Sequence, residues 1–97
     1  MICTSGIWVV KQGKEDEFER RWQETVDVLA LDRELRFRLL RDERNPQRFM
    51  SIGEGWKSVE QVEAALSTPS YQDNMAALWR VLESGEVSTL ELVAEVS

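Results

Sequence analysis

Hydrophobic residues recur along this chain with two periods, every second residue in some stretches and every third or fourth in others. The alternating stretches predict strands, because successive side chains of a strand point to opposite faces, and the longer period predicts amphipathic helices. The predicted strands cover Ile2–Lys11, Glu34–Asp42, Gln47–Trp56 and Val87–Val96. The predicted helices cover Glu15 to about Leu31, Val59 to Leu66, and a segment that begins with Thr68 as N-cap and Pro69 at the first helical position.

The apolar positions of the first and third helices place one face of each against a sheet. In the first helix these positions are Phe18, Trp22, Val26 and Leu29. In the third helix they are Tyr71, Met75, Leu78 and Leu82. We therefore expect the third helix to extend to Leu82, with Gly85 just past its C-terminus.

The order of elements is β-α-β-β-α-β with the second helix broken in two. This order is typical of the α+β class and of a ferredoxin-like sandwich, in which a four-stranded antiparallel sheet has its helices on one face. A chain of 97 residues is short enough to form a single domain, residues 1–97.

The stretch from Gln47 to Trp56 is the one around which a site is predicted. Strict alternation places one set of side chains on a single face, Met50, Ile52, Glu54 and Trp56. The glycines at 53 and 55 fall on the other face, where a helix can approach closely. Two interpretations of Trp56 stay open: a core residue at a strand end, or an aromatic wall of a pocket beside Glu54.

On this assignment the sheet face away from the helices is apolar. It carries Trp56, Ile52, Met50, Trp8 and Val10. A face of that kind is expected to be covered in a water-soluble protein. A two-fold homodimer that pairs sheet with sheet, and encloses a cavity, is the predicted solution.

Composition and charge narrow the classes of partner. The formal net charge is −6, which argues against binding to nucleic acid or to anionic membranes, since both need a basic footprint. Arginines nevertheless cluster between Arg33 and Arg48, either as a solvated strand face or as an anion-binding patch. The sequence lacks an apolar run of transmembrane length and a signal peptide, so a cytoplasmic location is the default expectation.

The absence of histidine excludes several chemistries. It removes Ser-His and Cys-His nucleophile activation and imidazole ligation of a metal or haem iron. Cys3 is the single cysteine, so an intramolecular disulfide and a zinc-binding cysteine cluster are also excluded. A catalytic function would depend on carboxylate, hydroxyl, arginine or aromatic side chains.

Several segments in this order make the chain similar to the antibiotic biosynthesis monooxygenase (ABM) family of dimeric α/β barrels. The resemblance covers nearly the whole chain and rests on residues 8–18, 39–42, 45–49, 56–58 and 67–71. It implies a homodimer with one pocket per subunit, between helices and sheet. It also implies oxidation of an aromatic polyketide, quinol-like or anthrone-like substrate by dioxygen, with no metal, flavin or haem cofactor.

The resemblance assigns roles to individual residues. Trp56 matches the family tryptophan at the end of the third strand and would stack on the substrate. Arg38 would stabilise the substrate anion if its strand face lines the pocket, Tyr71 would donate a hydrogen bond, and Glu54 is a candidate base. Trp8, Ile52 and Met50 would form the pocket wall.

Two departures from the family pattern matter. The oxygenases have an asparagine four residues before the tryptophan, where this chain has Ile52. The haem-degrading branch needs a histidine, and an asparagine where this chain has Gly6, so that branch is disfavoured. Two alternatives to a monooxygenase therefore stay open: a non-catalytic ligand-binding or stress-associated dimer, and a lyase or isomerase of a small apolar molecule.

Overall fold

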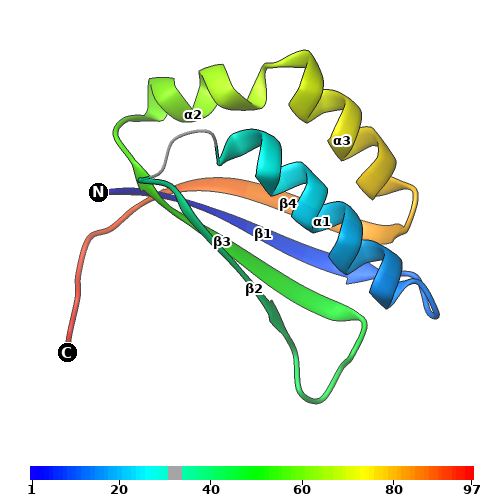
Figure 1. Ribbon diagram of the computed structural model, residues 1–97. Coiled ribbons are helices and arrows are strands. Elements are labelled where there is room, and N and C mark those ends of the chain that lie inside the picture. The colour runs from blue at the N-terminus through cyan, green and yellow to red at the C-terminus, as the bar shows by residue number, and fades with distance from the viewer. Residues whose placement is uncertain (31–33) are drawn as a thin grey trace.

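The computed structural model of the protein describes residues 1–30 and 34–97 and contains seven helices and strands (Figure 1). In chain order these are β1 (Ile2–Val10), α1 (Glu15–Leu29), β2 (Arg36–Arg41), β3 (Arg48–Trp56), α2 (Val59–Leu66), α3 (Pro69–Trp79) and β4 (Leu82–Glu91). The predicted order of elements is confirmed. Leu31, where α1 was expected to end, lies outside the described residues.

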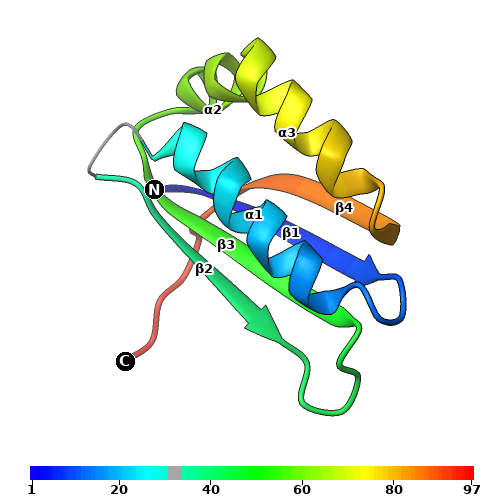
Figure 2. The ribbon, with the colours of Figure 1, turned by 45° about the vertical axis from the view of Figure 1, so that its right-hand side comes forward.

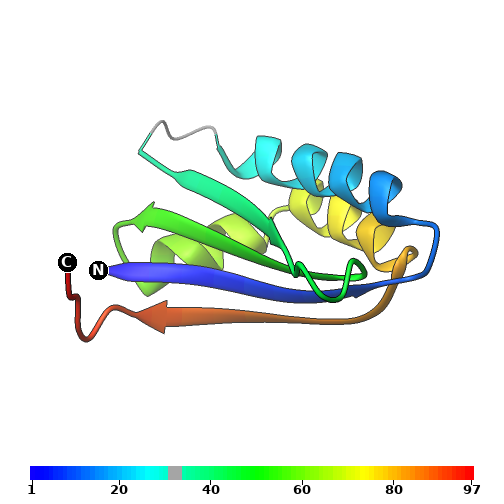
Figure 3. The same cartoon turned by 90° about the horizontal axis from the view of Figure 1, so that it is seen from below.

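The four strands form one antiparallel sheet in the order β2-β3-β1-β4. All helices lie on one face of this sheet (Figures 2 and 3). The predicted α+β ferredoxin-like fold with a four-stranded antiparallel sheet is confirmed.

The helix starts follow the local sequence. The Ser58 side chain accepts a hydrogen bond from the Gln61 backbone N–H, and Thr68 does the same for Tyr71 with Pro69 at the start of α3. These contacts satisfy N–H groups that a helix leaves without an intrahelical partner. The first turn of α1 carries three acidic residues, and their negative charges interact favourably with the positive end of the helix dipole.

The main core fills the space between the helices and the sheet. Its most deeply buried side chains are Phe18, Phe49, Leu78 and Val10, which come from α1, β3, α3 and β1. The Phe18 and Phe49 rings lie 4.8 Å apart between centroids. The helices and the sheet are thus joined by aromatic and aliphatic contacts on one sheet face only.

The predicted face of Trp56 is wrong, and the reason is a β-bulge. Between the pairs Ile2–Trp56 and Thr4–Gly53, three steps along β3 correspond to two along β1. Gly55 sits in the extra position with a φ of +96°, a conformation that L side chains rarely adopt. One extra residue reverses the alternation, so Trp56 turns to the helix-covered face.

The predicted faces of Trp8 and Val10 are wrong as well. Both side chains lie under the helices, where Trp8 is 4% and Val10 is 0% exposed. The prediction failed because the run from Ile7 to Val10 is apolar on both sides, so the sequence does not show which residues face the helices. The open face is therefore less aromatic than expected. It carries aliphatic side chains at Ile7, Leu40, Met50 and Ile52, together with arginine and glutamate.

The boundary between α3 and β4 also differs from the prediction. The helix ends at Trp79, and Leu82 is the first residue of β4, opposite Val10. The Lys11 N–H donates to the Val81 carbonyl, which fixes this turn against β1. Leu82 is buried here, as it would be at the end of a longer helix. The apolar period therefore could not show whether Leu82 ends the helix or begins the strand.

The last strand consequently lies earlier than expected and includes Gly85. It runs from Leu82 to Glu91 because its backbone pairs with β1 along the whole length. Residues 92–96, the last part of the predicted strand, contain no strand. Among the described residues, no helix combines the length and the apolar character needed to cross a bilayer.

Candidate functional site

A cavity of about 50 Å³ lies between the sheet and the helices. Its walls come from α1, α3, the end of α2 and the helix-covered face of the strands. The lining residues are Thr4, Ser5, Trp8, Trp22, Thr25, Val26, Leu29, Phe37, Ser51, Gly53, Trp56, Leu66, Tyr71, Met75, Leu78 and Val87. The site predicted from the sequence is thus divided, with Trp56, Trp8 and Tyr71 at this cavity and the other candidates elsewhere.

Trp56 lines the cavity from the end of β3. Its side chain is 4% exposed, and its indole N–H donates to the Thr4 hydroxyl oxygen at 3.1 Å. The Phe37 ring meets it edge-on, with centroids 6.2 Å apart and planes at 80°. These contacts hold the indole in one orientation.

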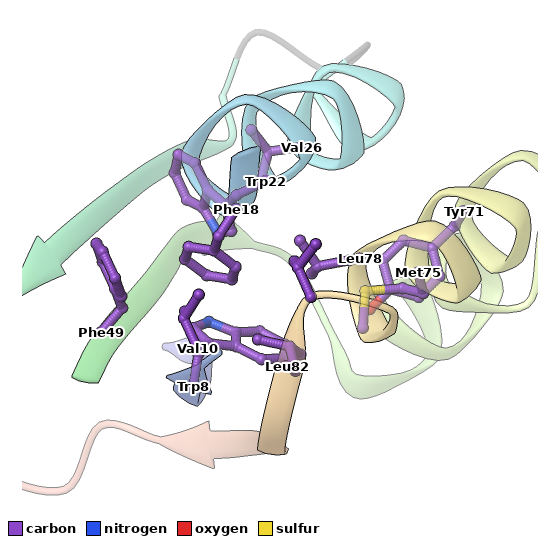
Figure 4. Close-up of a cluster of buried hydrophobic side chains, with 11 residues drawn as sticks. Trp8, Val10, Phe18, Trp22, Val26, Phe49, Tyr71, Met75, Leu78 and Leu82 are labelled. Carbon is purple, nitrogen blue, oxygen red and sulfur yellow. The ribbon is translucent and has the colours of Figure 1, made fainter. Parts of the chain in front are cut away.

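Trp8 forms the sheet side of the same cavity, and its indole lies below Phe18 of α1 (Figure 4). Its indole N–H donates to the Ser51 hydroxyl oxygen at 3.1 Å, and its ring contacts Phe18 at a centroid distance of 6.2 Å. A Cβ at Gly85 would lie 2.8 Å from the Trp8 ring. The glycine in β4 therefore leaves the space that this indole fills.

Tyr71 comes from the first turn of α3 and points toward the core beside Met75 (Figure 4). Within the described part of the chain its hydroxyl makes no hydrogen bond. Burial raises the pKa of the Tyr71 hydroxyl above its ordinary value of 10.0. A tyrosine hydroxyl is protonated near neutral pH even at its ordinary pKa, so this group is available as a donor to a ligand.

Arg38 and Glu54 lie on the opposite face of the sheet and pair with each other. The Arg38 guanidinium and the Glu54 carboxylate are 2.6 Å apart, and their side chains are 65% and 41% exposed. The condition under which Arg38 was expected to stabilise a bound anion is therefore not met at this cavity. Met50 and Ile52 share that open face and do not line the cavity either.

The position near Trp56 that faces the cavity is Gly53 rather than Ile52. A Cβ at Gly53 would contact the Thr4 hydroxyl and the Phe37 ring. These two side chains thus occupy the space that a larger residue at position 53 would need. Ile52, which stands where the oxygenases have an asparagine, therefore does not line this cavity.

The described residues that line the cavity include no charged side chain. Its polar groups are hydroxyls of serine, threonine and tyrosine, and the indole N–H groups of tryptophan. Such groups donate hydrogen bonds to an oxygen atom in surroundings where a hydrogen bond is electrostatically stronger than in water. The arrangement can stabilise charge that develops on a bound molecule, but it contains no carboxylate or imidazole base.

Thr4 and Ser51 were absent from the sequence-based candidates. They share the helix-covered face with Trp8, as the alternation along β1 and the pairing of Gly6 with Ser51 require. Alternation along β3 already places Ser51 on the face opposite Met50 and Ile52, and a correct parity for β1 would have added Thr4. In the described parts of the chain, no cluster of three or more cysteine, aspartate or glutamate side chains is arranged to hold a metal ion.

A family model described as "Antibiotic biosynthesis monooxygenase" matches residues 1–77, which is most of the chain. The protein belongs to the antibiotic biosynthesis monooxygenase family. The matched range includes every residue of the cavity except Leu78 and Val87. No functionally curated protein matches the chain by sequence.

Solved structures of similar shape share the fold at low sequence identity. SnoaB, a cofactor-independent oxygenase from Streptomyces nogalater, is 20% identical, with 98% of this chain and 95% of SnoaB covered and a TM-score of 0.86. A protein described as an antibiotic biosynthesis monooxygenase is 17% identical, with 97% and 100% covered and a TM-score of 0.81. A conserved protein from Methanosarcina mazei Go1 is 15% identical, with 92% and 89% covered and a TM-score of 0.80.

Proposed function

We propose that this protein is a cofactor-independent monooxygenase that oxidises an aromatic, anthrone-like or quinol-like molecule with dioxygen. The observation that carries the proposal is the aromatic cavity, lined by Trp8, Trp56 and Tyr71, inside a domain of the antibiotic biosynthesis monooxygenase family. The similarity in fold to SnoaB, a cofactor-independent oxygenase, supports it.

Each of these three residues has a role in the proposal. Trp56 stacks on the planar substrate, and Trp8 forms the wall on the sheet side of the cavity. Tyr71 donates a hydrogen bond to a substrate oxygen and stabilises the negative charge that develops there. Arg38 and Glu54 are outside this role, because they pair with each other on the open face.

For an anthrone, the reaction balances without an external reductant. The activated methylene loses a proton, and the resulting carbanion donates electrons to dioxygen and forms a C–O bond. Cleavage of the O–O bond then leaves one oxygen as the new carbonyl, and the other leaves as water with the two methylene hydrogens. Because no base lines the described cavity, the substrate C–H must be acidic enough to ionise once its oxygen is hydrogen-bonded.

The cavity is smaller than a substrate of this size. Its 50 Å³ compares with about 300–1,000 Å³ for typical ligand pockets. Binding of a fused aromatic ring therefore requires lining side chains to move. Met75 and Leu66 suit this movement, because methionine adapts its shape readily and Leu66 is the last residue of a short helix.

Oxygen consumption by the purified, metal-stripped protein with anthrone tests the proposal. We expect uptake above the autoxidation background, with one dioxygen consumed for each quinone formed. Trp56→Phe should lower the rate about tenfold, which corresponds to roughly 1.4 kcal/mol of lost transition-state stabilisation. Trp79→Phe is the matched control, because Trp79 is exposed and does not line the cavity.

Arg38→Gln provides a second control and should leave the rate unchanged. A loss of activity in Arg38→Gln would show that Arg38 takes part in the reaction, and would contradict the placement of the reaction in this cavity. Equal rates for wild type and Trp56→Phe would show that the reaction does not use this cavity.

A non-catalytic ligand-binding role is the second candidate, and the absence of a base among the described lining residues favours it. Binding of an aromatic molecule with no oxygen uptake for any anthrone or quinol tested would support that role. Mass spectrometry of the recovered molecule would distinguish it from a lyase or isomerase, since only the latter two change the molecule.

We also propose that the protein is a homodimer whose subunits meet through the open sheet face. Its aliphatic side chains and its exposed Arg38–Glu54 pair provide a mixed surface for such contact. The cavity lies within one subunit, so the proposed activity does not depend on this contact. Light scattering on a sizing column at micromolar concentration should give twice the 11.2 kDa chain mass.

A further inference from the structure

Two indole–hydroxyl pairs of the same kind connect β1 and β3 at the floor of the cavity. In one, the Trp56 N–H donates to Thr4, and in the other the Trp8 N–H donates to Ser51, each at 3.1 Å. Each pair joins a tryptophan of one strand to a hydroxyl of the other. All four side chains line the cavity.

The direction of these hydrogen bonds leaves each hydroxyl with a free donor. An indole N–H can only donate, so the hydroxyl oxygen must be the acceptor in both pairs. Within the described part of the chain, neither the Thr4 hydroxyl nor the Ser51 hydroxyl donates to another group. Both O–H groups are therefore available to an acceptor inside the cavity.

Each hydroxyl lies opposite a glycine, and a ring packs above that glycine beside the hydroxyl, Trp8 at Gly6 and Phe37 at Gly53. Ser51 pairs with Gly6 and Thr4 pairs with Gly53 in the sheet register. A Cβ at Gly6 would lie 2.7 Å from the Ser51 hydroxyl oxygen, and one at Gly53 would contact the Thr4 hydroxyl. Thr4 and Ser51 are therefore diagonal neighbours on adjacent strands, a relation that separates two residues by about 7–8 Å.

This spacing and the absence of charge define a ligand. Donors on residues about 7–8 Å apart are too far apart to share one oxygen, so each takes its own acceptor. The described lining offers no cation for a carboxylate or phosphate. An uncharged planar ring with oxygen acceptors at opposite ends satisfies both conditions.

We propose that Thr4 and Ser51 are the specificity-determining residues of this cavity, and that their hydroxyls, each oriented by an indole N–H, bind the two opposed oxygens of a quinone-type ring. The proposal rests on the proposed function only for the position of the site. It adds two residues that hold the ring through its oxygens, while Trp8 and Trp56 position the hydroxyls as well as forming the walls.

Duroquinone and durene are suitable probes, because they have the same tetramethyl ring with and without the two opposed oxygens. The indole N–H signals of the four tryptophans, in correlation spectra of isotope-labelled protein, report binding at the cavity. We expect wild type to bind duroquinone more tightly than durene. Thr4→Val and Ser51→Ala should each weaken duroquinone binding about fivefold, with durene binding unchanged.

Conservative variants and a control separate ligand binding from folding. Thr4→Val leaves the buried Trp56 N–H without its acceptor, so this variant is expected to be less stable. Thr4→Ser retains a hydroxyl and should retain duroquinone binding. Ser84→Ala removes an exposed hydroxyl on β4 away from the cavity and should change neither affinity.

Three results would overturn the proposal. They are equal affinity of wild type for duroquinone and durene, equal losses for both probes in the variants, and no binding of duroquinone up to its solubility limit. If Thr4→Val does not fold, Ser51→Ala and Thr4→Ser still decide between these outcomes.

The oxygen-uptake assay keeps this inference separate from the proposed function. Selective duroquinone binding without anthrone oxidation would support the proposed role of the two hydroxyls and contradict the proposed monooxygenase activity. Anthrone oxidation that is unchanged in Ser51→Ala, together with equal binding of the two probes, would support the proposed monooxygenase activity and contradict the proposed role of the two hydroxyls.

Discussion

The two faces of the sheet are built from the same four strands, yet they carry different chemistry. The helix-covered face holds Trp8, Trp56 and Phe49 with hydroxyls between them, and the open face holds the Arg38–Glu54 pair among aliphatic side chains. On the covered face a charge would lose its hydration, which is costly unless it is paired. On the open face water remains available to both charges. The comparison indicates that the covered face is the place for an aromatic ligand and the open face the place for contact with a partner.

A pair of core and surface truncations should give the largest contrast between the faces. Phe18→Ala removes a ring with 0% exposure and should destabilise the protein by about 3–5 kcal/mol. Leu40→Ala removes a side chain that is 50% exposed on the open face and should cost less than about 1 kcal/mol in the monomer. Urea unfolding at low protein concentration measures both. Similar losses for the two variants would mean that the open face is covered.

The bulge at Gly55 can be tested as the element that turns Trp56 to the covered face. Gly55→Ala introduces a Cβ that would meet the Glu34 carbonyl at a positive φ, so we expect a loss of roughly 2–3 kcal/mol and a more solvent-exposed Trp56 fluorescence.

Gly13→Ala is the control for that variant. Gly13 also has a positive φ, of 84°, but a Cβ there would meet nothing within 4 Å. It should therefore show the conformational cost alone, about 1 kcal/mol, with Trp56 unchanged. Equal effects at the two glycines would show that the close backbone contact at Gly55 is unimportant.

The smallest effect concerns pH and the buried Tyr71 hydroxyl. Its pKa in the folded protein is raised above 10.0, so the folded state holds this proton more tightly than the unfolded state does. This contribution is fully present below about pH 10 and is lost as the pH rises from that value through the folded-state pKa. Urea midpoints at pH 9 and pH 11, about one unit on either side of the ordinary value, should therefore fall more for wild type than for Tyr71→Phe. An identical fall in both proteins would place the Tyr71 hydroxyl in solvent.

Local sequence signals predicted much of the fold. The alternation and the helical periods gave the order of elements, and Ser58, Thr68 and Pro69 begin the helices where capping chemistry places them. Trp56 and Tyr71 were identified as candidates for a pocket and do line the cavity. Trp8 lines it too, although the sequence had placed it on the other face.

The remaining candidates show where local reasoning ends. Glu54, Met50 and Ile52 were grouped with Trp56 because strict alternation gives them one face, and Arg38 was a candidate only if its own strand face lined the pocket. The bulge breaks that alternation at a single glycine, and its conformation depends on the Glu34 backbone packed against it. The start of β4 was missed for a similar reason, since backbone pairing with β1 outweighs the low strand propensity of residues 83–86.

The sequence by itself determined the order of elements, the helix starts and the aromatic content of the core, because these depend on residues close together in the chain. Tertiary structure decided which face each strand residue occupies, where α3 ends, and that Thr4 and Ser51 meet the indoles of Trp56 and Trp8. Those contacts join residues 52 and 43 positions apart, and only the register between β1 and β3 brings them together. A shift of one residue in that register would exchange the two faces of a strand, and the cavity with them.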